Sequence, residues 1–322
     1  MEERKPLIVL TGPTAVGKTQ LSLSLAKAVE GEIVSADSMQ VYEYMDIGSA
    51  KIKHEEREGI PHHLIDILKP WEPFNVVLFK QLCEQAFKGI YERGHVPILT
   101  GGTGFYIQSV LYGIDFTETA EDTAYREELA KIADTQGAEV LHAMLKEADP
   151  AAAGAIHPHN VKRMIRALEY YRQTGASIEA HNQEERKKES RYSSCYFVLN
   201  DDRDKLYERI DERVEEMLAR GLLEEVKGLL AMGCKRDMIS MQGLGYKEII
   251  ASLEGEYDLE EAVRRIKRDT RHFAKRQLTW FRREKDVIWV EKPAFAYDEQ
   301  AMLAFMCSCF QEKLKKERER KE

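Results

Sequence analysis

One run of eight residues near the start of the sequence has the types and spacing needed to hold phosphate groups. It matches the phosphate-binding loop (P-loop) pattern Gly-x-x-x-x-Gly-Lys-Ser/Thr and reads Gly12-Pro13-Thr14-Ala15-Val16-Gly17-Lys18-Thr19. The glycines let the backbone curl so that successive N–H groups point at phosphate oxygens. Lys18 adds a mobile cation, and the Thr19 hydroxyl is a ligand for Mg²⁺ that bridges the phosphates. The run predicts a diphosphate site without saying which molecule carries the diphosphate.

Two more polar residues are expected beside this loop. Asp37 follows an apolar run at residues 32–36, and Thr103 follows another at residues 96–100. Open α/β folds bind ligands at the carboxyl ends of their strands. At that edge the Asp37 carboxylate is suited to a metal ion or to general-base catalysis, with a solvated carboxylate as the alternative. The Thr103 hydroxyl, within Gly101-Gly102-Thr103-Gly104, is placed to reach a phosphate oxygen.

A basic segment at residues 263–283 points to a second kind of ligand. Helical spacing would align four of its cations, with only Asp269 opposing them: Arg264, Arg268, Arg271 and Lys275. Such a stripe neutralises a phosphate backbone and favours RNA over a plain solvated helix face. A second cluster, Lys162, Arg163 and Arg166, is by itself more typical of a surface helix.

The elements that must position these residues follow from the apolar pattern. Strands are expected at residues 7–10, 32–36, 64–68 and 96–100, and helices at about 17–29, at 76–93 and after Gly104. Short apolar strands that alternate with helices predict an α/β fold, a P-loop NTPase-like parallel sheet with helices on both faces.

The pattern changes after about residue 116. Residues 117–194 show helical patterns without a convincing strand, and the run at 195–199 returns to the sheet. We therefore expect a helical insertion domain at 117–194, within a P-loop α/β core at 1–116 and 195–322 that has a helical C-terminal part. A final strand is expected at 287–290, and the charged tail at 311–322 is expected to be a frayed helix or disordered.

Composition is that of an ordinary globular protein. Of the 322 residues, 43% are hydrophobic and 32% are charged, and no apolar run approaches the roughly 20 residues that cross a bilayer. No secretory signal is visible, and the five dispersed cysteines suggest neither a disulfide framework nor a zinc site, so a cytoplasmic location is expected. The net charge of −8 argues against nucleic acid only on average, because salt screens charges beyond about 8 Å and local patches decide.

Together these segments resemble the bacterial tRNA dimethylallyltransferases, also called tRNA isopentenyltransferases. The matching motifs run in order from about residue 7 to residue 290: GPTAVGKT (12–19), DSMQVY (37–42), MDIGSAK (45–51), PHHLID (61–66), GGTGFY (101–106), HP (157–158), RMIRALE (163–169), RIDER (209–213), GLGYKE (243–248) and AKRQLTW (274–280). Several motifs in the same order make this resemblance more specific than any one of them.

The resemblance implies transfer of a dimethylallyl group from dimethylallyl diphosphate to the exocyclic amine of the adenosine just 3′ of a tRNA anticodon. The P-loop then holds the prenyl diphosphate instead of ATP. Loop amides, Lys18, Arg213 and Mg²⁺ on Thr19 would stabilise the leaving diphosphate, with Thr103 near its bridging oxygen. Asp37 would be the general base that accepts a proton from the amine.

The resemblance also implies how tRNA is held. The target adenine leaves its stack to enter the pocket, and the anticodon stem-loop lies on the insertion and the basic segments. The implied contact residues are Asp37, Ser38, Met39, Gln40, Thr103, Arg126, Lys162, Arg163, Met164, Ile165, Arg166, Arg271, Lys275 and Arg276. No membrane partner is implied, and we expect a monomer because one chain can enclose one stem-loop. Eukaryotic members carry a C-terminal zinc finger, which this tail lacks.

Three other functions share part of the pattern. A small-molecule or nucleoside kinase would explain the P-loop and Asp37 but not the basic aromatic segment at 263–283. An adenylate isopentenyltransferase would not need the helical insertion. A regulatory P-loop NTPase that binds RNA without modifying it would use the same two surfaces, and only an assay of the reaction separates it from a transferase.

Overall fold

The computed structural model describes residues 4–114, 122–185 and 187–319. The chain divides into two units. Residues 1–111 and 191–322 form one, called here the core unit, and residues 112–190 form the other, called the helical unit. The division therefore falls a few residues from the expected domain limits, at the end of one helix and at the start of one strand.

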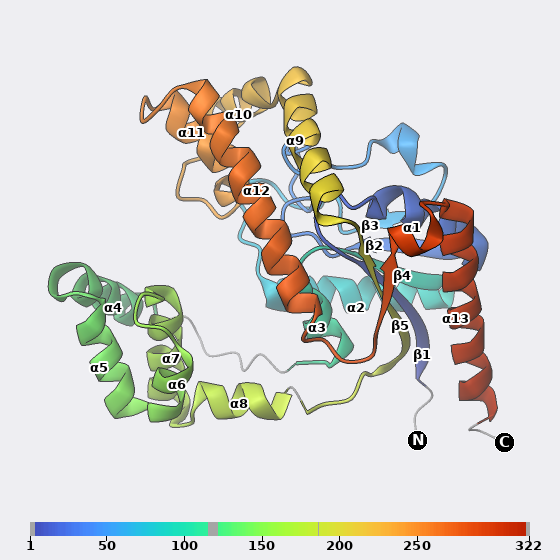
Figure 1. Cartoon of the computed structure of the whole chain (residues 1–322). Coiled ribbons are helices and arrows are strands. Elements are labelled where there is room, and N and C mark those ends of the chain that lie inside the picture. The colour runs from blue at the N-terminus through green and yellow to red at the C-terminus, as the bar shows by residue number, and fades with distance from the viewer. Residues whose placement is uncertain (1–3, 115–121, 186, 320–322) are drawn as a thin grey trace. The chain divides into compact units, whose positions relative to one another are not determined.

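The core unit is built on a sheet of six strands in the order β3-β2-β4-β1-β5-β6, and every neighbouring pair is parallel (Figure 1). The strands are β1 (Lys5–Thr11), β2 (Gly31–Ser35), β3 (His62–His63), β4 (Val96–Gly101), β5 (Tyr192–Asn200) and β6 (Val287–Glu291). Because all strands run the same way, their carboxyl ends meet at one edge. The predicted P-loop fold with a parallel sheet is confirmed.

Successive side chains of a strand point to opposite faces of the sheet, so alternate residues face opposite layers of helices. Ile8 and Leu10 of β1 pack in one apolar cluster with α1 (Lys18–Val29) and α13 (Glu299–Glu319). On the other face Phe87 of α2 (Val76–Glu92) meets Tyr192 of β5, with ring centroids 5.6 Å apart. Both faces are covered, which is why the strands read as continuous apolar runs.

The strand expected at residues 64–68 is wrong. The edge strand β3 covers only His62–His63, and Leu68 forms an isolated bridge with Tyr42. Leu64 and Asp66 have φ of 62° and 56°, in the left-handed region, so the backbone cannot continue as a strand there. Leu64 is buried, with 6% of its surface exposed. Its apolar side chain suggested a strand, but the residue lies in an irregular segment.

Much of the remaining core unit is helical. Its further helices are α3 (Gly104–Leu111), α9 (Arg203–Ala219), α10 (Leu222–Ala231), α11 (Tyr246–Leu253) and α12 (Leu259–Phe281), with short 3₁₀ turns at His54–Arg57, Ser240–Gln242 and Lys292–Phe295. The charged tail continues α13 as helix to Glu319. The residues beyond it, to which the tail prediction extends, lie outside the described part of the chain.

The helical unit consists of α4 (Thr123–Gln136), α5 (Ala138–Ala148), α6 (Pro150–Ala155), α7 (Val161–Thr174) and α8 (Ile178–Glu185). Its centre is a separate apolar cluster that includes Leu129, Leu141, Leu145 and Met164, all at 0% exposure. Asn160 caps α7 by accepting the backbone N–H of Arg163. The unit thus has its own core, consistent with an insertion that folds around helix packing.

Within the described residues no helix combines the length and apolar character of a membrane span. The same residues contain no group of three or more His, Cys, Asp or Glu side chains that could hold a metal ion. All five cysteines are free, and burial raises the thiol pKa at each of them. A raised pKa keeps each thiol in its less reactive, protonated form.

Candidate active site

The P-loop lies between β1 and α1, at the carboxyl edge of the sheet. Gly12 has φ 147°, and a Cβ there would lie 2.2 Å from the carbonyl oxygen of Leu199 on β5, so only glycine fits. Gly17 forms the N-cap of α1 and has no side chain to accept the first-turn N–H groups. Uncapped N–H groups at a helix start are suited to binding an anion. The predicted strand–loop–helix context is therefore present.

Lys18 lies inside the curve of this loop. Its Nζ donates to the carbonyl oxygens of Gly12 at 3.0 Å and Pro13 at 2.8 Å. The pKa of Lys18 is lowered to about 7, chiefly by burial and also by the Arg213 guanidinium, while the Asp37 carboxylate opposes both effects. Burial also lowers the pKa of Arg213 on α9, which Asp37 counteracts. The structure thus brings Lys18, Arg213 and Asp37, far apart in the sequence, within electrostatic range of one another.

Asp37 directly follows β2 and the buried Ala36. Its Oδ1 accepts the backbone N–H groups of Met39 at 2.8 Å and Gln40 at 3.4 Å, which fixes the carboxylate in a turn. Among the described residues no hydrogen bond reaches Oδ2, so this oxygen remains available as an acceptor. The Thr103 N–H donates to the carbonyl oxygen of Ala36 at 3.3 Å. The loops after β2 and β4 are therefore joined, and Thr103 lies beside Asp37.

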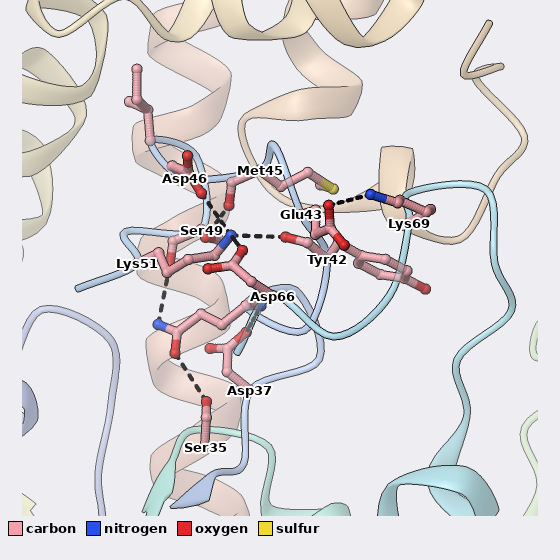
Figure 2. A network of polar contacts seen from close by, with 12 residues as sticks. Ser35, Asp37, Tyr42, Glu43, Met45, Asp46, Ser49, Lys51, Asp66 and Lys69 are labelled. Carbon is pink, nitrogen blue, oxygen red and sulfur yellow. Dashed lines mark hydrogen bonds and ion pairs between the residues drawn. The ribbon is translucent and has the colours of Figure 1, made fainter. Parts of the chain in front are cut away.

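A polar network holds the segment that follows Asp37 (Figure 2). The buried ammonium of Lys51 donates to Tyr42 O at 2.8 Å, to Asp46 Oδ1 at 2.7 Å and to Asp66 Oδ1. Lys51 is 4% exposed, so its three acceptors replace the water that burial removed. The left-handed backbone at Asp66, which ends any strand there, is what presents this carboxylate to Lys51.

Gln40 belongs to the same network. Its Oε1 accepts from Ser35 Oγ at 2.9 Å, and its Nε2 donates to the Ser49 carbonyl at 3.4 Å. Nearby, the Glu225 carboxylate on α10 accepts the backbone N–H groups of Asp46, Ile47 and Gly48. The segment beginning at Asp37 is thus anchored from two sides, and the Gln40 amide points along a fixed direction.

Two residues without a predicted role lie against the P-loop. Gln277 on α12 accepts the Thr14 N–H at 2.9 Å, and Lys292 Nζ donates to the Val16 carbonyl at 3.3 Å. Burial lowers the Lys292 pKa, helped by Arg209 and opposed by Asp201. Lys292 directly follows β6. Its position at the carboxyl edge of the sheet is the sequence feature that could have indicated a place in the site. Gln277 lies within AKRQLTW. However, no sequence pattern distinguishes a helical glutamine that bonds a distant loop from one that lies on the surface.

The basic stripe expected at residues 263–283 lies on α12, but much of its charge is paired. Arg264 and Arg265 contact Glu261, Lys267 contacts Glu215, and Arg271 contacts Asp211 on α9. Asp269 is the only acidic residue within the segment, but carboxylates outside it, on α9 and in the first turn of α12, also pair with its cations. Lys275 and Arg276 are exposed, and in the described part of the chain neither has a carboxylate partner.

In the helical unit the predicted RNA contacts differ in exposure. Lys162 and Arg163 are exposed on the first turn of α7, whereas Met164 is 0% exposed in the apolar core and Ile165 is half-buried. Arg126 and Arg166 both bind the fully buried Glu169, each at 2.8 Å. The side chain of Met164 therefore faces the core of its unit, and the guanidinium groups of Arg126 and Arg166 are held at Glu169.

The sequence is similar to proteins of known activity. A family model described as IPP transferase matches residues 40–284, and one described as isopentenyl transferase matches residues 5–66. A tRNA dimethylallyltransferase of Lachnoclostridium phytofermentans is 59% identical over 91% of this chain and 94% of its own length. One from Carboxydothermus hydrogenoformans is 50% identical over 88% and 91%.

Solved structures agree with these relatives. The tRNA isopentenylpyrophosphate transferase of Bacillus halodurans has a TM-score of 0.73 and 43% identity, covering 98% of this chain and all of its own. A eukaryotic dimethylallyltransferase acting on tRNA has a TM-score of 0.74 and 30% identity, covering 89% of this chain and 74% of its own. With the P-loop, Asp37 and Thr103 assembled at one sheet edge, and with relatives of this identity over most of its length, the chain belongs to the tRNA dimethylallyltransferase family.

Proposed function

We propose that this chain transfers a dimethylallyl group from dimethylallyl diphosphate to the exocyclic amine of the adenosine 3′-adjacent to the anticodon in tRNA, releasing diphosphate. The observation that carries this proposal is the grouping of two cations, Lys18 and Arg213, with one carboxylate, Asp37, at a P-loop. Stabilising a leaving diphosphate needs the cations, and deprotonating an amine needs the carboxylate. The named relatives favour this reaction over the kinase alternative.

The loop stabilises the diphosphate as it leaves. An allylic C–O bond breaks readily once the negative charge on its oxygen is held, because the carbon fragment gains the character of an allyl cation. First-turn amides of α1, Lys18 and Arg213 provide fixed positive groups for that charge. Thr103, on the loop joined to Ala36, donates its hydroxyl to the bridging oxygen. These groups are already assembled by the fold, so little reorganisation accompanies the bond cleavage.

Asp37 is the general base of the proposal. The adenine amine is a weak nucleophile because its lone pair is delocalised into the ring, and its proton becomes acidic as the new C–N bond forms. Asp37 Oδ1 is held by the N–H groups of Met39 and Gln40, which leaves Oδ2 to accept that proton. The neighbouring side chains Ser38, Met39 and Gln40 contact the extruded base, with the Gln40 amide fixed by Ser35 and Ser49.

The residues around the loop fit a magnesium ion. Among the described residues no cluster of three carboxylate, imidazole or thiol groups exists, so a metal here would rely on few protein ligands. Mg²⁺ usually keeps several waters and binds one or two protein groups plus substrate phosphates. Thr19 is exposed at the start of α1, and in the described chain its hydroxyl donates to no protein acceptor. Bound there, Mg²⁺ supplies charge neutralisation at the diphosphate oxygens.

Exposed cations in each unit are the proposed tRNA contacts. Lys162 and Arg163 on α7 and Lys275 and Arg276 on α12 are exposed, while Arg126, Arg166 and Arg271 are held by carboxylates. Phosphate contacts of this kind weaken with salt and carry little sequence information. One chain supplies all the groups named, so the proposed unit of activity is a monomer.

The test is transfer of label. The protein is incubated with unmodified tRNA, Mg²⁺ and dimethylallyl diphosphate labelled in its prenyl group, and ATP hydrolysis is followed in parallel. We expect label in the tRNA at the adenosine next to the anticodon. Phosphoryl transfer from ATP with no label in tRNA would contradict the proposal and favour a kinase. A parallel reaction with AMP in place of tRNA checks the adenylate alternative.

A further inference from the structure

Gln277 on α12 joins two loops of the candidate active site that are far apart in the sequence. Its Oε1 accepts the backbone N–H of Thr14 in the P-loop at 2.9 Å. Its Nε2 donates to the carbonyl oxygen of Gly102 at 3.0 Å, one residue before Thr103. The residue is 6% exposed, so little water competes for these hydrogen bonds. A single amide therefore links the loop of Lys18 to the loop of Thr103.

The glycine-rich loop is shaped to receive this helix. A Cβ at Gly102 would lie 2.1 Å from Nε2 of Gln277, and a Cβ at Gly104 would lie 2.2 Å from Cδ1 of Trp280. Gln277 and Trp280 are three residues apart and so lie on one face of α12. Both glycines are required for close approach to the helix, and the approach brings the Gln277 amide into contact with both loops.

The two hydrogen bonds need a primary amide. Thr14 presents a donor and Gly102 an acceptor, and glutamine satisfies both at once with opposite ends of the same group. A carboxylate would keep the bond from Thr14 but could not donate to Gly102, and it would add negative charge beside a diphosphate site. A leucine or methionine would fill the space without either bond. Packing alone thus does not explain the residue type.

We propose that Gln277 is a positioning residue that holds the P-loop and Thr103 at the separation at which both contact one diphosphate. The inference rests on the proposed function only for the identity of that shared ligand. Gln277 itself contacts backbone groups, and its effect on the reaction passes through Thr14 and Gly102. Loss of the bridge is expected to weaken diphosphate binding and slow bond cleavage, while leaving the exposed cations of α12 in place.

Two substitutions disrupt the hydrogen bonds of the Gln277 amide, one at Gln277 itself and one at Gly102. Gln277→Met keeps the length of the side chain but makes neither hydrogen bond. Gly102→Ala keeps Gln277 but displaces its amide, because Nε2 is the one atom closer than 3.0 Å to the new Cβ and Gly102 does not have a positive φ. Thr279→Ala on the exposed side of the same helix is the matched control, since its hydroxyl only bonds the Lys275 carbonyl.

The measurements are calorimetric affinity for inorganic diphosphate with Mg²⁺, the single-turnover rate of prenyl transfer, and affinity for tRNA. For Gln277→Met and Gly102→Ala we expect the diphosphate Kd to rise and the single-turnover rate to fall, each about 10- to 100-fold, with tRNA affinity within about twofold. Thr279→Ala should change neither diphosphate affinity nor rate. A lowered melting temperature with unchanged diphosphate affinity and rate would show a structural role only and overturn the proposal.

A double substitution sharpens the test. With Gln277→Ala in place the clash at Gly102 is gone, so adding Gly102→Ala should cost less than about twofold, whereas alone it costs at least about tenfold. Additive effects would refute the proposed contact. If the unsubstituted protein binds no diphosphate, the proposed function fails and the inference with it. If it binds diphosphate as tightly as Gln277→Met does, the inference alone fails.

Discussion

Binding of diphosphate should be accompanied by uptake of a proton at Lys18. In the free protein burial and the Arg213 guanidinium hold the Lys18 pKa at about 7, against the opposing effect of Asp37. A bound diphosphate favours the charged ammonium and so raises this pKa above the working pH. From the titration of a group with a pKa near 7, about half a proton is taken up at pH 7 and about 0.9 at pH 8, but only about 0.1 at pH 6.

Because binding takes up a proton, the affinity for diphosphate should fall as the pH rises. Because the binding-competent, charged form of Lys18 is depleted above pH 7, the apparent Kd should rise about tenfold between pH 6 and pH 8. Calorimetry of diphosphate with Mg²⁺ in buffers of different ionisation enthalpy measures the protons taken up. Lys18→Met is the control, since it removes the titrating group and leaves the ligand's own protonation. Equal uptake by the two proteins at pH 8 would refute the assignment.

Three further outcomes are expected. Asp37→Asn should lower turnover about 10²- to 10⁴-fold with unchanged tRNA affinity in filter binding, and near-normal turnover would exclude Asp37 as the base. Lys51→Met should lower the free energy of unfolding by about 1–3 kcal/mol in urea titration, since it leaves the Tyr42 carbonyl and two partly exposed carboxylates without their donor. An unchanged unfolding midpoint would show that the network in Figure 2 does not stabilise the fold. Glu169→Ala should lower the stability of the helical unit by about 3 kcal/mol, because two arginines lose their buried partner. Hydrogen exchange of α4 and α7 checks this, and protection equal to that of the unsubstituted protein would contradict it.

The predictions that held came from local patterns. The P-loop is contiguous, and its phosphate chemistry depends on eight neighbouring residues that fold between a strand and a helix whatever lies farther away. The strands at the centre of the sheet are apolar on both faces and the helices repeat near 3.6 residues, so β1, β2, β4 and β5 and the helices α1 and α2 were predictable within a few residues.

The structural details that the sequence did not predict involve partners distant in the sequence. The strand expected at residues 64–68 has the right composition, but the left-handed Asp66 turns its carboxylate toward Lys51 and ends the extended backbone. The stripe on α12 has the right period, but Asp211 and Glu215 reach it from α9. No local pattern records which carboxylate will neutralise which cation, since that depends on how two helices pack.

The sequence by itself thus determined the phosphate-binding loop, the parallel α/β fold and the order of motifs that indicates prenyl transfer to tRNA. Tertiary structure alone decided which side chains meet at the proposed diphosphate site. Lys18, Asp37 and Arg213 come from α1, from the end of β2 and from α9, and Gln277 comes from α12. The parallel sheet gathers its loops at one edge, and electrostatic and hydrogen-bonding groups act there through distances that only the folded chain defines.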